Sequence, residues 1–199
     1  MYLRLKRLFD FLIALVALIL LTPLYLFLII LIKIDSRGPV LFKQKRVGKD
    51  KQYFNIYKFR SMRHDTPKDV PTHLLEDPNR WITRMGRILR RTSLDELPQI
   101  VNVLKGDMAI VGPRPALYTQ DDLITERDKY GANNIRPGIT GLAQIYGRDE
   151  LPIPVKAELD GRYVTMIGPW RDLKIIIRTL LTAFTGKGVV EGKHDSESE

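Results

Sequence analysis

The sequence contains no cysteine, so disulfide bonds, thiolate metal sites and cysteine nucleophiles are all excluded. Its three histidines lie far apart and have no partner at metal-ligand spacing, which argues against a zinc site. The glycines form neither a Walker loop nor a Rossmann fingerprint, and no serine stands in a nucleophile-elbow pattern. Nucleotide binding, if present, is therefore of another kind, and a serine hydrolase is disfavoured.

Acidic residues are outnumbered by basic ones, 23 against 32, which gives a net charge of +9. The last nine residues hold four acids and one lysine, so the rest of the chain carries about +12. This surplus predicts an anionic partner: nucleic acid, lipid headgroups or a phosphorylated substrate. A chain of 199 residues is long enough for one compact domain.

The longest apolar run covers residues 11–32 and is interrupted only by Thr22 and Pro23. At about 1.5 Å per residue, a straight helix of this run is long enough to span the apolar core of a bilayer. Pro23 lacks the amide hydrogen that would bond to the Ile19 carbonyl, so the helix is expected to kink. A buried helix of a soluble protein is disfavoured, because the run is apolar on every face.

Basic residues flank this run on both sides: Arg4, Lys6 and Arg7 before it, and Lys33, Arg37, Lys43, Lys45 and Arg46 after it. Because Lys and Arg favour the cytoplasmic side of a membrane, both ends of the run qualify for that side. A helix bent at Thr22-Pro23 would keep both ends there as a re-entrant segment. A crossing helix with a tolerated proline is the alternative, and the residues alone leave both open.

The remainder predicts short strands at residues 40–48 and 52–62 around a turn at 49–51, followed by a long loop at 63–80. Residues 81–91 predict an amphipathic helix with Trp81, Met85, Ile88 and Leu89 on one face. Such a basic helix suits a membrane interface, although a surface helix packed on the core is equally consistent.

Residues 93–104 predict a helix that ends at Gly106, with Ser93 and Glu96 at the spacing of a capping box. A strand at 108–111 is expected to run into the rigid turn Gly112-Pro113-Arg114-Pro115. Residues 135–148 predict a glycine-punctuated loop, and residues 172–184 predict a C-terminal amphipathic helix.

The adjacent acids Asp95 and Glu96 are candidates for chemistry, because arginines precede them at 84, 87, 90 and 91. Those charges and a predicted helix N-terminus favour ionised carboxylates and bound anions. An ionised aspartate among arginines can attack phosphorus, although such a pair often only complements a helix dipole. The setting favours chemistry, since basic residues occupy turns, strand ends and Gly/Pro-rich loops where they can be aimed at phosphates: Lys58, Arg60, Arg90, Arg114, Arg136 and Arg148.

With these residues in view, the chain closely resembles the small monotopic phosphoglycosyl transferases, a family of bacterial sugar transferases. The matching segments are LKRLFDFLIALVALILLTPLYLFLIILI, GPVLFKQKRVG, NIYKFRSM, LRRTSLDELPQIVNVLKGDMAIVGPRP and IRPGITGLAQIYGR. They cover most of residues 5–148 in the family's order, and the combination of SLDELPQ, GPRP and RPGITG is highly specific.

The resemblance implies an α+β, monotopic membrane protein with a kinked re-entrant N-terminal helix, amphipathic interfacial helices and a small β-hairpin. The expected parts are a membrane helix at 1–36, a cytoplasmic catalytic domain at 37–188 and a disordered acidic tail at 189–199. The expected location is the bacterial inner membrane, with the active site facing the cytoplasm. Larger members carry an additional N-terminal membrane domain, so the chain is expected to be a minimal catalytic unit.

The activity implied is transfer of a sugar 1-phosphate from a UDP-sugar to polyprenyl phosphate, usually undecaprenyl phosphate, as the first membrane step of glycan assembly. Asp95 would attack the β-phosphate, release UMP and hold the phospho-sugar covalently, with Glu96 as the second catalytic acid. Mg²⁺ is the implied cofactor, assigned to Asp95, with Glu96 as an alternative contact.

By the same resemblance, Lys58, Arg90 and Arg114 match phosphate-binding positions. The loop near the donor nucleotide is matched by Arg136, Thr140, Gln144 and Arg148. Arg60 joins these candidates through its place in the basic set. The implied partners are the UDP-sugar, the polyprenyl phosphate and membrane lipids rather than nucleic acid, while a homodimer stays open.

Two other interpretations are consistent with parts of the sequence. A membrane-anchored basic module without catalysis would explain the positive charge, but not the acidic pair beside so many arginines. A phosphatase or nucleotide-sugar hydrolase would share the covalent chemistry and use water in place of a lipid acceptor. The release of UMP from UDP-sugars separates the binding module from the enzymes. The sugar and the glycan pathway are not specified by the residues.

Overall fold

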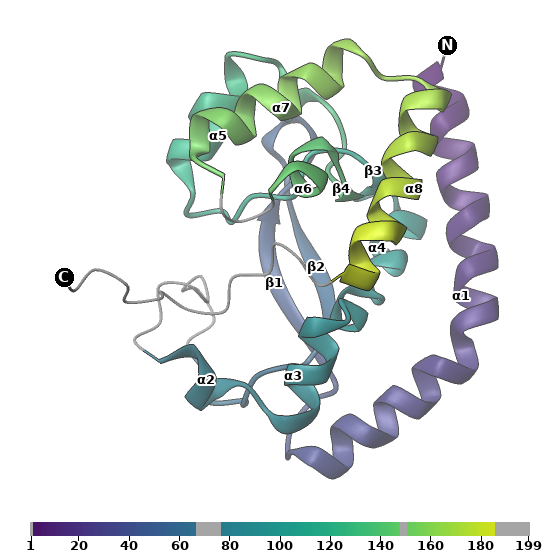
Figure 1. Ribbon diagram of the computed structural model, residues 1–199, viewed down its shortest axis with the longest axis vertical. Coiled ribbons are helices and arrows are strands. Elements are labelled where there is room, and N and C mark those ends of the chain that lie inside the picture. Colours follow the sequence, from purple (N-terminus) through teal and green to yellow (C-terminus); the bar gives the residue numbers. More distant parts are fainter. Residues whose placement is uncertain (1, 67–76, 148–150, 186–199) are drawn as a thin grey trace.

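The computed structural model describes residues 2–66, 77–147 and 151–185. Its longest element is α1, Tyr2–Asp35, a helix of 34 residues with Pro23 inside it. The ribbon of α1 changes direction partway along its length, so that its two halves run along different sides of the molecule (Figure 1). The Thr22 hydroxyl donates to the Leu18 carbonyl at 2.8 Å, next to the Ile19 carbonyl that Pro23 cannot bond. Among the described residues, α1 alone is long and apolar enough to cross a membrane.

The predicted hairpin is confirmed. Strands β1, Leu41–Val47, and β2, Tyr53–Phe59, pair antiparallel with Phe42 opposite Lys58 and Arg46 opposite Phe54. The turn between them is a short 3-10 segment, η1, Lys49–Lys51. Because side chains alternate along a strand, Lys58 and Arg46 lie on the same face of the hairpin.

The segment predicted as one amphipathic helix at 81–91 is divided in two. The short α2, Pro78–Trp81, precedes α3, Arg84–Arg91, because Thr83 caps α3 by accepting a hydrogen bond from the Gly86 amide at 2.9 Å. The predicted shared face is confirmed for Met85 and Leu89, which pack on the core, and is wrong for Ile88, which is exposed, and for Trp81, which belongs to α2. The predicted loop at 63–80 lies largely outside the described residues.

A second small sheet lies near the middle of the molecule. Strand β3, Ala109–Val111, follows α4, Gln99–Lys105, and pairs in parallel with β4, Gly138–Thr140. The residues predicted as a glycine-punctuated loop thus contain β4 and the helix α6, Leu142–Tyr146. Gly106 ends α4 with a φ of 91°, as expected for a glycine cap.

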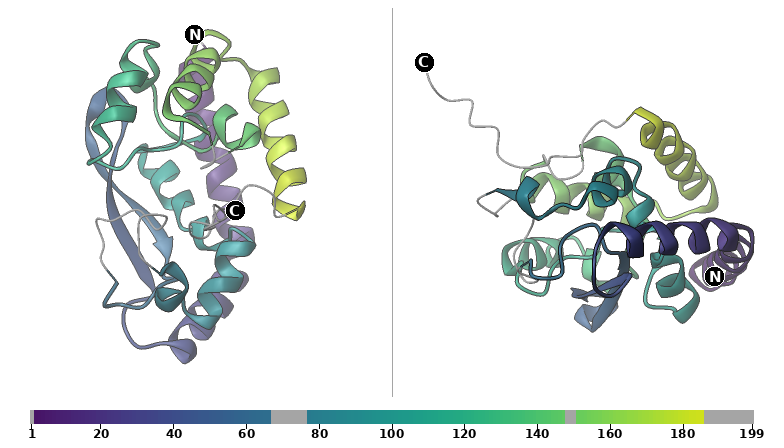
Figure 2. Two further views of the ribbon diagram at one scale, coloured as in Figure 1. Left: turned by 60° about the vertical axis from the view of Figure 1, so that its left-hand side comes forward. Right: turned by 90° about the horizontal axis from the view of Figure 1, so that it is seen from below.

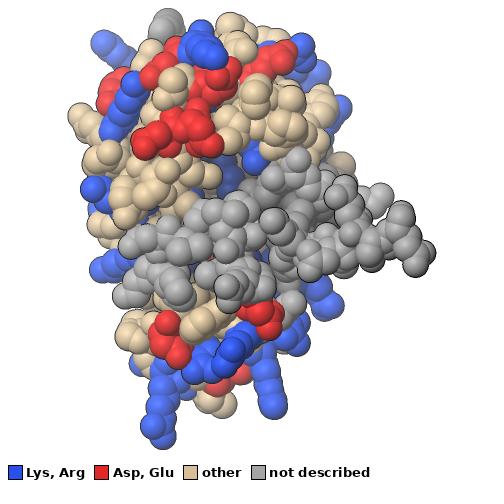
Figure 3. All heavy atoms as spheres, turned by 90° about the vertical axis from the view of Figure 1, so that its left-hand side faces the viewer, with Lys and Arg blue, Asp and Glu red and all other residues tan. Residues whose placement is uncertain are grey.

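Helices α5, Asp121–Asp128, and α7, Ile153–Thr165, pack together at one end of the molecule, joined through the 3-10 turn η4, Ala132–Asn134. Helix α8, Pro169–Thr185, confirms the predicted C-terminal helix and lies beside the first half of α1 (Figure 2). On the face shown in Figure 3, acidic side chains gather toward the end that carries α5, and basic side chains project from the opposite end.

Both halves of α1 pack on the same body. In the first half, Ala14 joins a core cluster with Ile56 of β2 and Val103 of α4. In the second half, Leu28 and Ile32 join another cluster, with Phe59 of β2 and Leu89 of α3. Most other apolar side chains of α1 stay exposed, including Ile19, Leu20, Phe27 and Ile30. The helix therefore has one side against the protein and a long apolar side that the protein leaves uncovered.

Candidate functional site

The acidic pair lies on a short 3-10 turn, η3, Leu94–Glu96, ahead of α4. Ser93 enters this turn with a φ of 57°, a left-handed conformation that is uncommon for a residue with a side chain. The predicted capping box is wrong, since the Ser93 side chain makes no capping hydrogen bond. Glu96 points its carboxylate at two cations instead, and Pro98 delays the start of α4 to Gln99.

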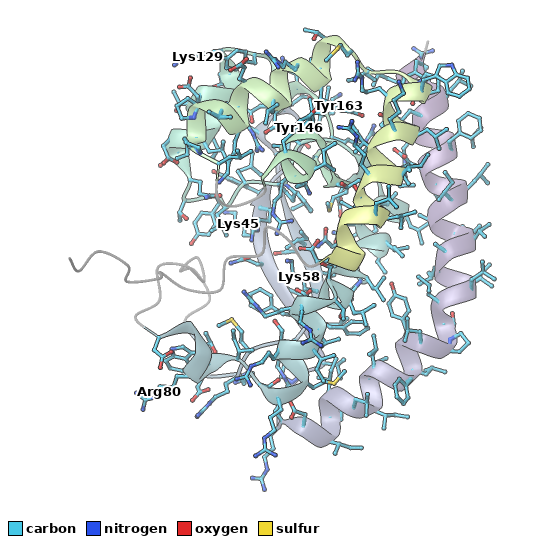
Figure 4. The ribbon with its side chains drawn as sticks, in the orientation of Figure 1. Lys45, Lys58, Arg80, Lys129, Tyr146 and Tyr163 are labelled. Atoms are coloured by element: carbon cyan, nitrogen blue, oxygen red, sulfur yellow. The ribbon has the colours of Figure 1, made fainter. Side chains whose placement is uncertain are left out.

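Glu96 joins two segments that are far apart in the sequence. Its Oε1 accepts hydrogen bonds from Lys58 Nζ at 2.7 Å and from Arg114 Nη2 at 3.2 Å. Lys58 comes from β2, beside α4 (Figure 4), and Arg114 from the turn after β3. Burial by itself would raise the pKa of Glu96, but the two cations outweigh it and hold that pKa well below its usual range.

Asp95 is more deeply enclosed, with 7% of its surface exposed. Its Oδ2 lies 3.8 Å from Lys58 Nζ, beyond hydrogen-bonding distance. Burial raises the pKa of Asp95, and the charge of Glu96 adds to the effect, while Lys58, Arg90 and Arg114 oppose it. The sequence predicted that nearby arginines favour the ionised form of both acids. For Asp95 the direction is the reverse, because desolvation outweighs the cations.

The structure thus brings together five predicted residues, which we call the site cluster: Lys58, Arg90, Asp95, Glu96 and Arg114. Three cations and two carboxylates leave one surplus positive charge when both acids are ionised. A positive surplus at a partly buried site is suited to a phosphate, whose oxygens accept charge-assisted hydrogen bonds from lysine and arginine.

Other predicted site residues make contacts within the fold. Arg60 is buried, and its guanidinium donates to the carbonyls of Pro39 and Ser36, both at 2.6 Å, behind the end of α1. Arg136 Nε donates to the Gly106 carbonyl at 2.8 Å. These bonds give both arginines a role in holding backbone, and their predicted contact with substrate stays a prediction.

The predicted donor loop packs against α8. The Thr140 hydroxyl is 2.6 Å from that of Thr179, and Gln144 Nε2 donates to the Ile139 carbonyl at 2.9 Å. Gln144 Oε1 is buried and has no hydrogen-bond partner among the described residues. Arg148 lies outside the described residues, as does the predicted tail at 189–199. The roles assigned to these residues stay predictions.

The turn that carries Arg114 is fixed by close backbone packing. The Gly112 amide donates to the Thr140 carbonyl at 2.8 Å, and the Pro113 carbonyl accepts from the Gly138 amide at 2.8 Å. A Cβ at Gly112 would meet the Arg136 carbonyl at 2.5 Å, so only glycine allows this approach. Sequence reasoning identified the turn but missed Arg46, which donates to the Pro115 carbonyl at 3.1 Å. The strand pattern, with a basic residue on the face of Lys58, was the signal that could have identified it.

Among the described residues, no group of three or more His, Asp or Glu side chains forms a metal site by itself. The donor set at η3 nevertheless fits Mg²⁺, which commonly binds one or two carboxylates and completes its coordination with substrate phosphates and water. Because Glu96 Oε1 already accepts two hydrogen bonds, Asp95 is the better candidate ligand of the two acids.

Residues 1–186 match the family described as bacterial sugar transferase. The chain belongs to this family. The sugar transferase is 45% identical over 201 residues to the exopolysaccharide production protein PSS of Rhizobium leguminosarum, covering 92% of this chain and 98% of that protein. It is 41% identical to the UDP-N-acetylgalactosamine-undecaprenyl-phosphate N-acetylgalactosaminephosphotransferase of Aeromonas hydrophila, with 94% of this chain aligned.

A third relative is the UDP-glucose:undecaprenyl-phosphate glucose-1-phosphate transferase of Caulobacter vibrioides, 40% identical over 90% of this chain and 70% of its own. The sugar transferase spans 45% of the Aeromonas protein, so the matched part of that relative is less than half of its length. The two transferases are named for different sugars, N-acetylgalactosamine and glucose.

Proposed function

We propose that the protein transfers a sugar 1-phosphate from a UDP-sugar to undecaprenyl phosphate through a covalent intermediate on Asp95. The observation that carries the proposal is the site cluster, a buried aspartate beside a glutamate that two cations hold in place. The names of the Aeromonas and Caulobacter relatives support the donor and acceptor classes. The product, a polyprenyl diphosphate sugar, is a starting point for glycan assembly.

The chemistry proceeds in two displacements at one phosphorus atom. A carboxylate oxygen of Asp95 attacks the β-phosphorus of the UDP-sugar, and the bond from that phosphorus to the bridging oxygen breaks. UMP leaves with the electron pair, and the sugar phosphate stays bound to Asp95. An oxygen of undecaprenyl phosphate then attacks the same phosphorus, and the Asp95 carboxylate leaves. Covalent capture divides one difficult transfer into two easier ones.

The cations of the site cluster supply the electrostatic part of this mechanism. Lys58 and Arg114 come from different segments and converge on Glu96, so the fold fixes their charges before the donor arrives. Fixed cations stabilise the negative charge that develops on the phosphoryl oxygens. Mg²⁺ held by Asp95 and the donor phosphates would neutralise further charge on the diphosphate. Glu96 would act on the incoming lipid phosphate. The support is that its charge acts on Asp95 and that its own pKa lies well below the usual range, so it stays ionised.

The covalent step is tested by mixing the full-length protein with a panel of UDP-sugars and Mg²⁺ in the absence of lipid acceptor. We expect one sugar-phosphate mass on the protein, mapped to Asp95, together with UMP release of about one equivalent. Asp95→Asn should abolish both, because a neutral amide is a poor nucleophile. Addition of undecaprenyl phosphate should discharge the adduct. An adduct on another residue, or release that requires both substrates to be bound together, would contradict the mechanism.

We also propose that α1 enters and leaves the membrane on the cytoplasmic side. The support is that both of its ends are tied to the same body. Near its start, Arg7 donates to the Val103 and Leu104 carbonyls of α4 at 2.6 and 3.0 Å. Near its end, Asp35 Oδ2 accepts from the Met85 amide of α3 at 3.1 Å. A helix that crossed the membrane would place these two attachments on opposite sides.

Helix α8 supports the same orientation. It lies beside the first half of α1 (Figure 1) and exposes an apolar stripe, and the basic residues at 171, 174 and 178 border one side of that stripe. Such a pattern is typical of a helix lying in the membrane interface. Tyr25 of α1 donates to the Leu97 carbonyl at 2.6 Å, so the second half of α1 lies directly against the turn of Asp95. A lipid phosphate at the membrane surface would therefore be close to the acidic pair. The exposed stripe consists of Trp170, Leu173, Ile177, Leu180 and Leu181.

The topology is tested with single cysteines, which this cysteine-free chain allows without background. We expect cysteines placed at Met1 and at Ser36 to resist an impermeant thiol reagent in intact cells and to react after the cells are permeabilised. Labelling of either position from outside would contradict the re-entrant arrangement. Pro23→Ala should shift part of the population toward a crossing topology, since it restores the missing amide donor.

A further inference from the structure

Arg46 of β1 holds the turn that carries Arg114. Its Nη1 donates to the Pro115 carbonyl at 3.1 Å, and its Nη2 donates to Gln44 Oε1 at 2.6 Å. The adjacent Val47 amide donates to the Ala116 carbonyl at 2.9 Å, so the backbone after Arg114 lies along β1 like a short additional strand. The guanidinium therefore bonds to the carbonyl of the residue that directly follows Arg114.

The opposite side of Arg114 is held as well. The Pro113 carbonyl accepts from the Gly138 amide, while Pro113 and Pro115 each restrict their own φ. Arg114 thus lies between two residues whose carbonyls accept hydrogen bonds: Pro113 accepts from β4, and Pro115 accepts from Arg46. Of these two anchors, the side-chain bond from Arg46 can be removed without changing the backbone of the turn.

The hairpin gives Arg46 a second link to the site. Arg46, Gln44 and Lys58 share one hairpin face, because Arg46 pairs with Phe54 and Lys58 pairs with Phe42. The same hairpin therefore supplies Lys58 directly to Glu96 and, through Arg46, fixes the turn that supplies Arg114 to the same oxygen. The distance between the two cations of Glu96 depends on how firmly the turn is held against β1.

We propose that Arg46 is a positioning residue, which acts on the transfer reaction by holding Arg114 in place to stabilise the phosphoryl group. This inference rests on the proposed function for its kinetic consequence, although the placement of the turn can be measured without it. Since displacement of a catalytic group by about 1 Å can cost a hundredfold in rate, Arg46→Ala should reduce kcat by about ten- to a hundredfold. The donor KM should change little.

The decisive test is a double-mutant cycle in the full-length enzyme, comparing Arg46→Ala, Arg114→Ala and both together. If Arg46 acts through Arg114, its removal in the Arg114→Ala background should have almost no further effect on kcat. Additive losses, or a raised donor KM with unchanged kcat, would overturn the proposal. Lys45→Ala is the matched control, because Lys45 is a basic neighbour on the opposite face of β1, with its Nζ 4.0 Å from the Tyr53 ring centre. Its turnover should be unchanged.

A second measurement does not depend on activity. Hydrogen exchange of the Arg114, Ala116 and Leu117 amides should be faster in Arg46→Ala than in wild type. Gln44→Ala should give a smaller increase in the same direction because Arg46 loses its orienting acceptor. Unchanged exchange in both variants would overturn the proposal. If exchange is faster in Arg46→Ala but the wild-type protein releases no UMP, the proposed function would be contradicted. The contact between Arg46 and the turn would still stand.

Discussion

Lys6 and Lys58 each lie close to two carboxylates, but Lys6 lies in a buried cluster and Lys58 in one that is partly open to solvent. The two clusters also differ in the sign of their net charge. Lys6 Nζ is 2.8 Å from Asp172 Oδ2 and 3.4 Å from Asp10 Oδ2. The hydroxyls of Tyr2 and Tyr163 donate to Asp172 at 2.8 and 2.7 Å; Tyr163 is labelled in Figure 4. This seam cluster, formed by these five residues, joins α1 to α7 and α8 and contains one more carboxylate than cations.

In the seam cluster, the surplus carboxylate accepts hydrogen bonds from the protein's own hydroxyls. Tyr163 also donates to the Val111 carbonyl at 3.1 Å, and burial followed by the charge of Asp172 raises the pKa of Tyr163. The site cluster has the opposite surplus and brings two of its three cations, Lys58 and Arg114, together on a single glutamate oxygen. Burial of charge alone therefore does not identify an active site. Two properties are more informative. One is the sign of the cluster's surplus charge, and the other is whether the protein's own polar groups already bond to that charge.

The largest expected effect is on stability, in the seam cluster. Lys6→Met leaves Asp10 and Asp172 buried without their lysine, which should lower the free energy of unfolding by about 3–5 kcal/mol. Thermal unfolding in detergent measures the loss, and turnover per folded molecule should stay near wild type. A large loss of kcat at unchanged stability would show that the seam cluster takes part in the chemistry.

In the site cluster, Arg114→Ala should lower turnover and leave stability almost unchanged. Removal of a cation that stabilises the transition state costs about 3 kcal/mol, so turnover should fall by roughly a hundredfold or more. Stability should change little, because 39% of the Arg114 side chain is exposed. Steady-state kinetics and a melting curve of the same preparation test both halves of this expectation. Near-normal activity would assign Arg114 to packing.

The two acids of the site cluster should also lose their charge at different pH values. Because burial raises the pKa of Asp95, the ionised form that attacks phosphorus in the proposed mechanism is lost on acidification at a higher pH than for an exposed aspartate. The pKa of Glu96 lies below its usual range, so Glu96 stays ionised through that change. The rate of adduct formation in a single turnover should therefore fall as pH drops through the raised pKa of Asp95. A rate that stays constant down to the range of an exposed aspartate would contradict this assignment.

The smallest effect is expected at an exposed ion pair. Lys51 Nζ lies 2.6 Å from Asp128 Oδ2, yet 52% and 42% of the two side chains are exposed. Solvent and salt screen such pairs, so Lys51→Ala should cost only about 0.2–1 kcal/mol of stability. The same melting assay used for Lys6→Met provides the comparison. Equal losses in the two variants would show that burial does not distinguish these pairs.

Several parts of this molecule could be predicted from local pattern. The alternation in residues 40–62 predicts the hairpin, and the uninterrupted apolar run predicts α1. Gly106 marks the end of α4, as expected for a helix cap. The adjacent acids and the arginine between two prolines were likewise visible as unusual local chemistry. In each case the information lies within a few residues of the feature, so no distant contact is needed.

The capping box and the ionisation of Asp95 could not be predicted in this way. The spacing of Ser93 and Glu96 fits a helix cap, but the cations that attract Glu96 come from β2 and from the turn after β3. Desolvation of Asp95 likewise depends on segments that pack around η3. Helices α5 and α7 carry little local signal, and Arg127 and Asp160 reveal their buried ion pair, 2.6 Å between Nη2 and Oδ2, only after the two helices pack.

By itself, the sequence determined the family, the apolar helix, the hairpin and the acidic pair, because each is encoded in local spacing and composition. Only the tertiary structure decided which cations meet which carboxylates. It assigned Lys58 and Arg114 to Glu96, directed Arg60 to backbone carbonyls and revealed Arg46 behind the turn. The physical reason is that an electrostatic interaction depends on distance and burial, and both are set by packing between segments that are remote in the chain.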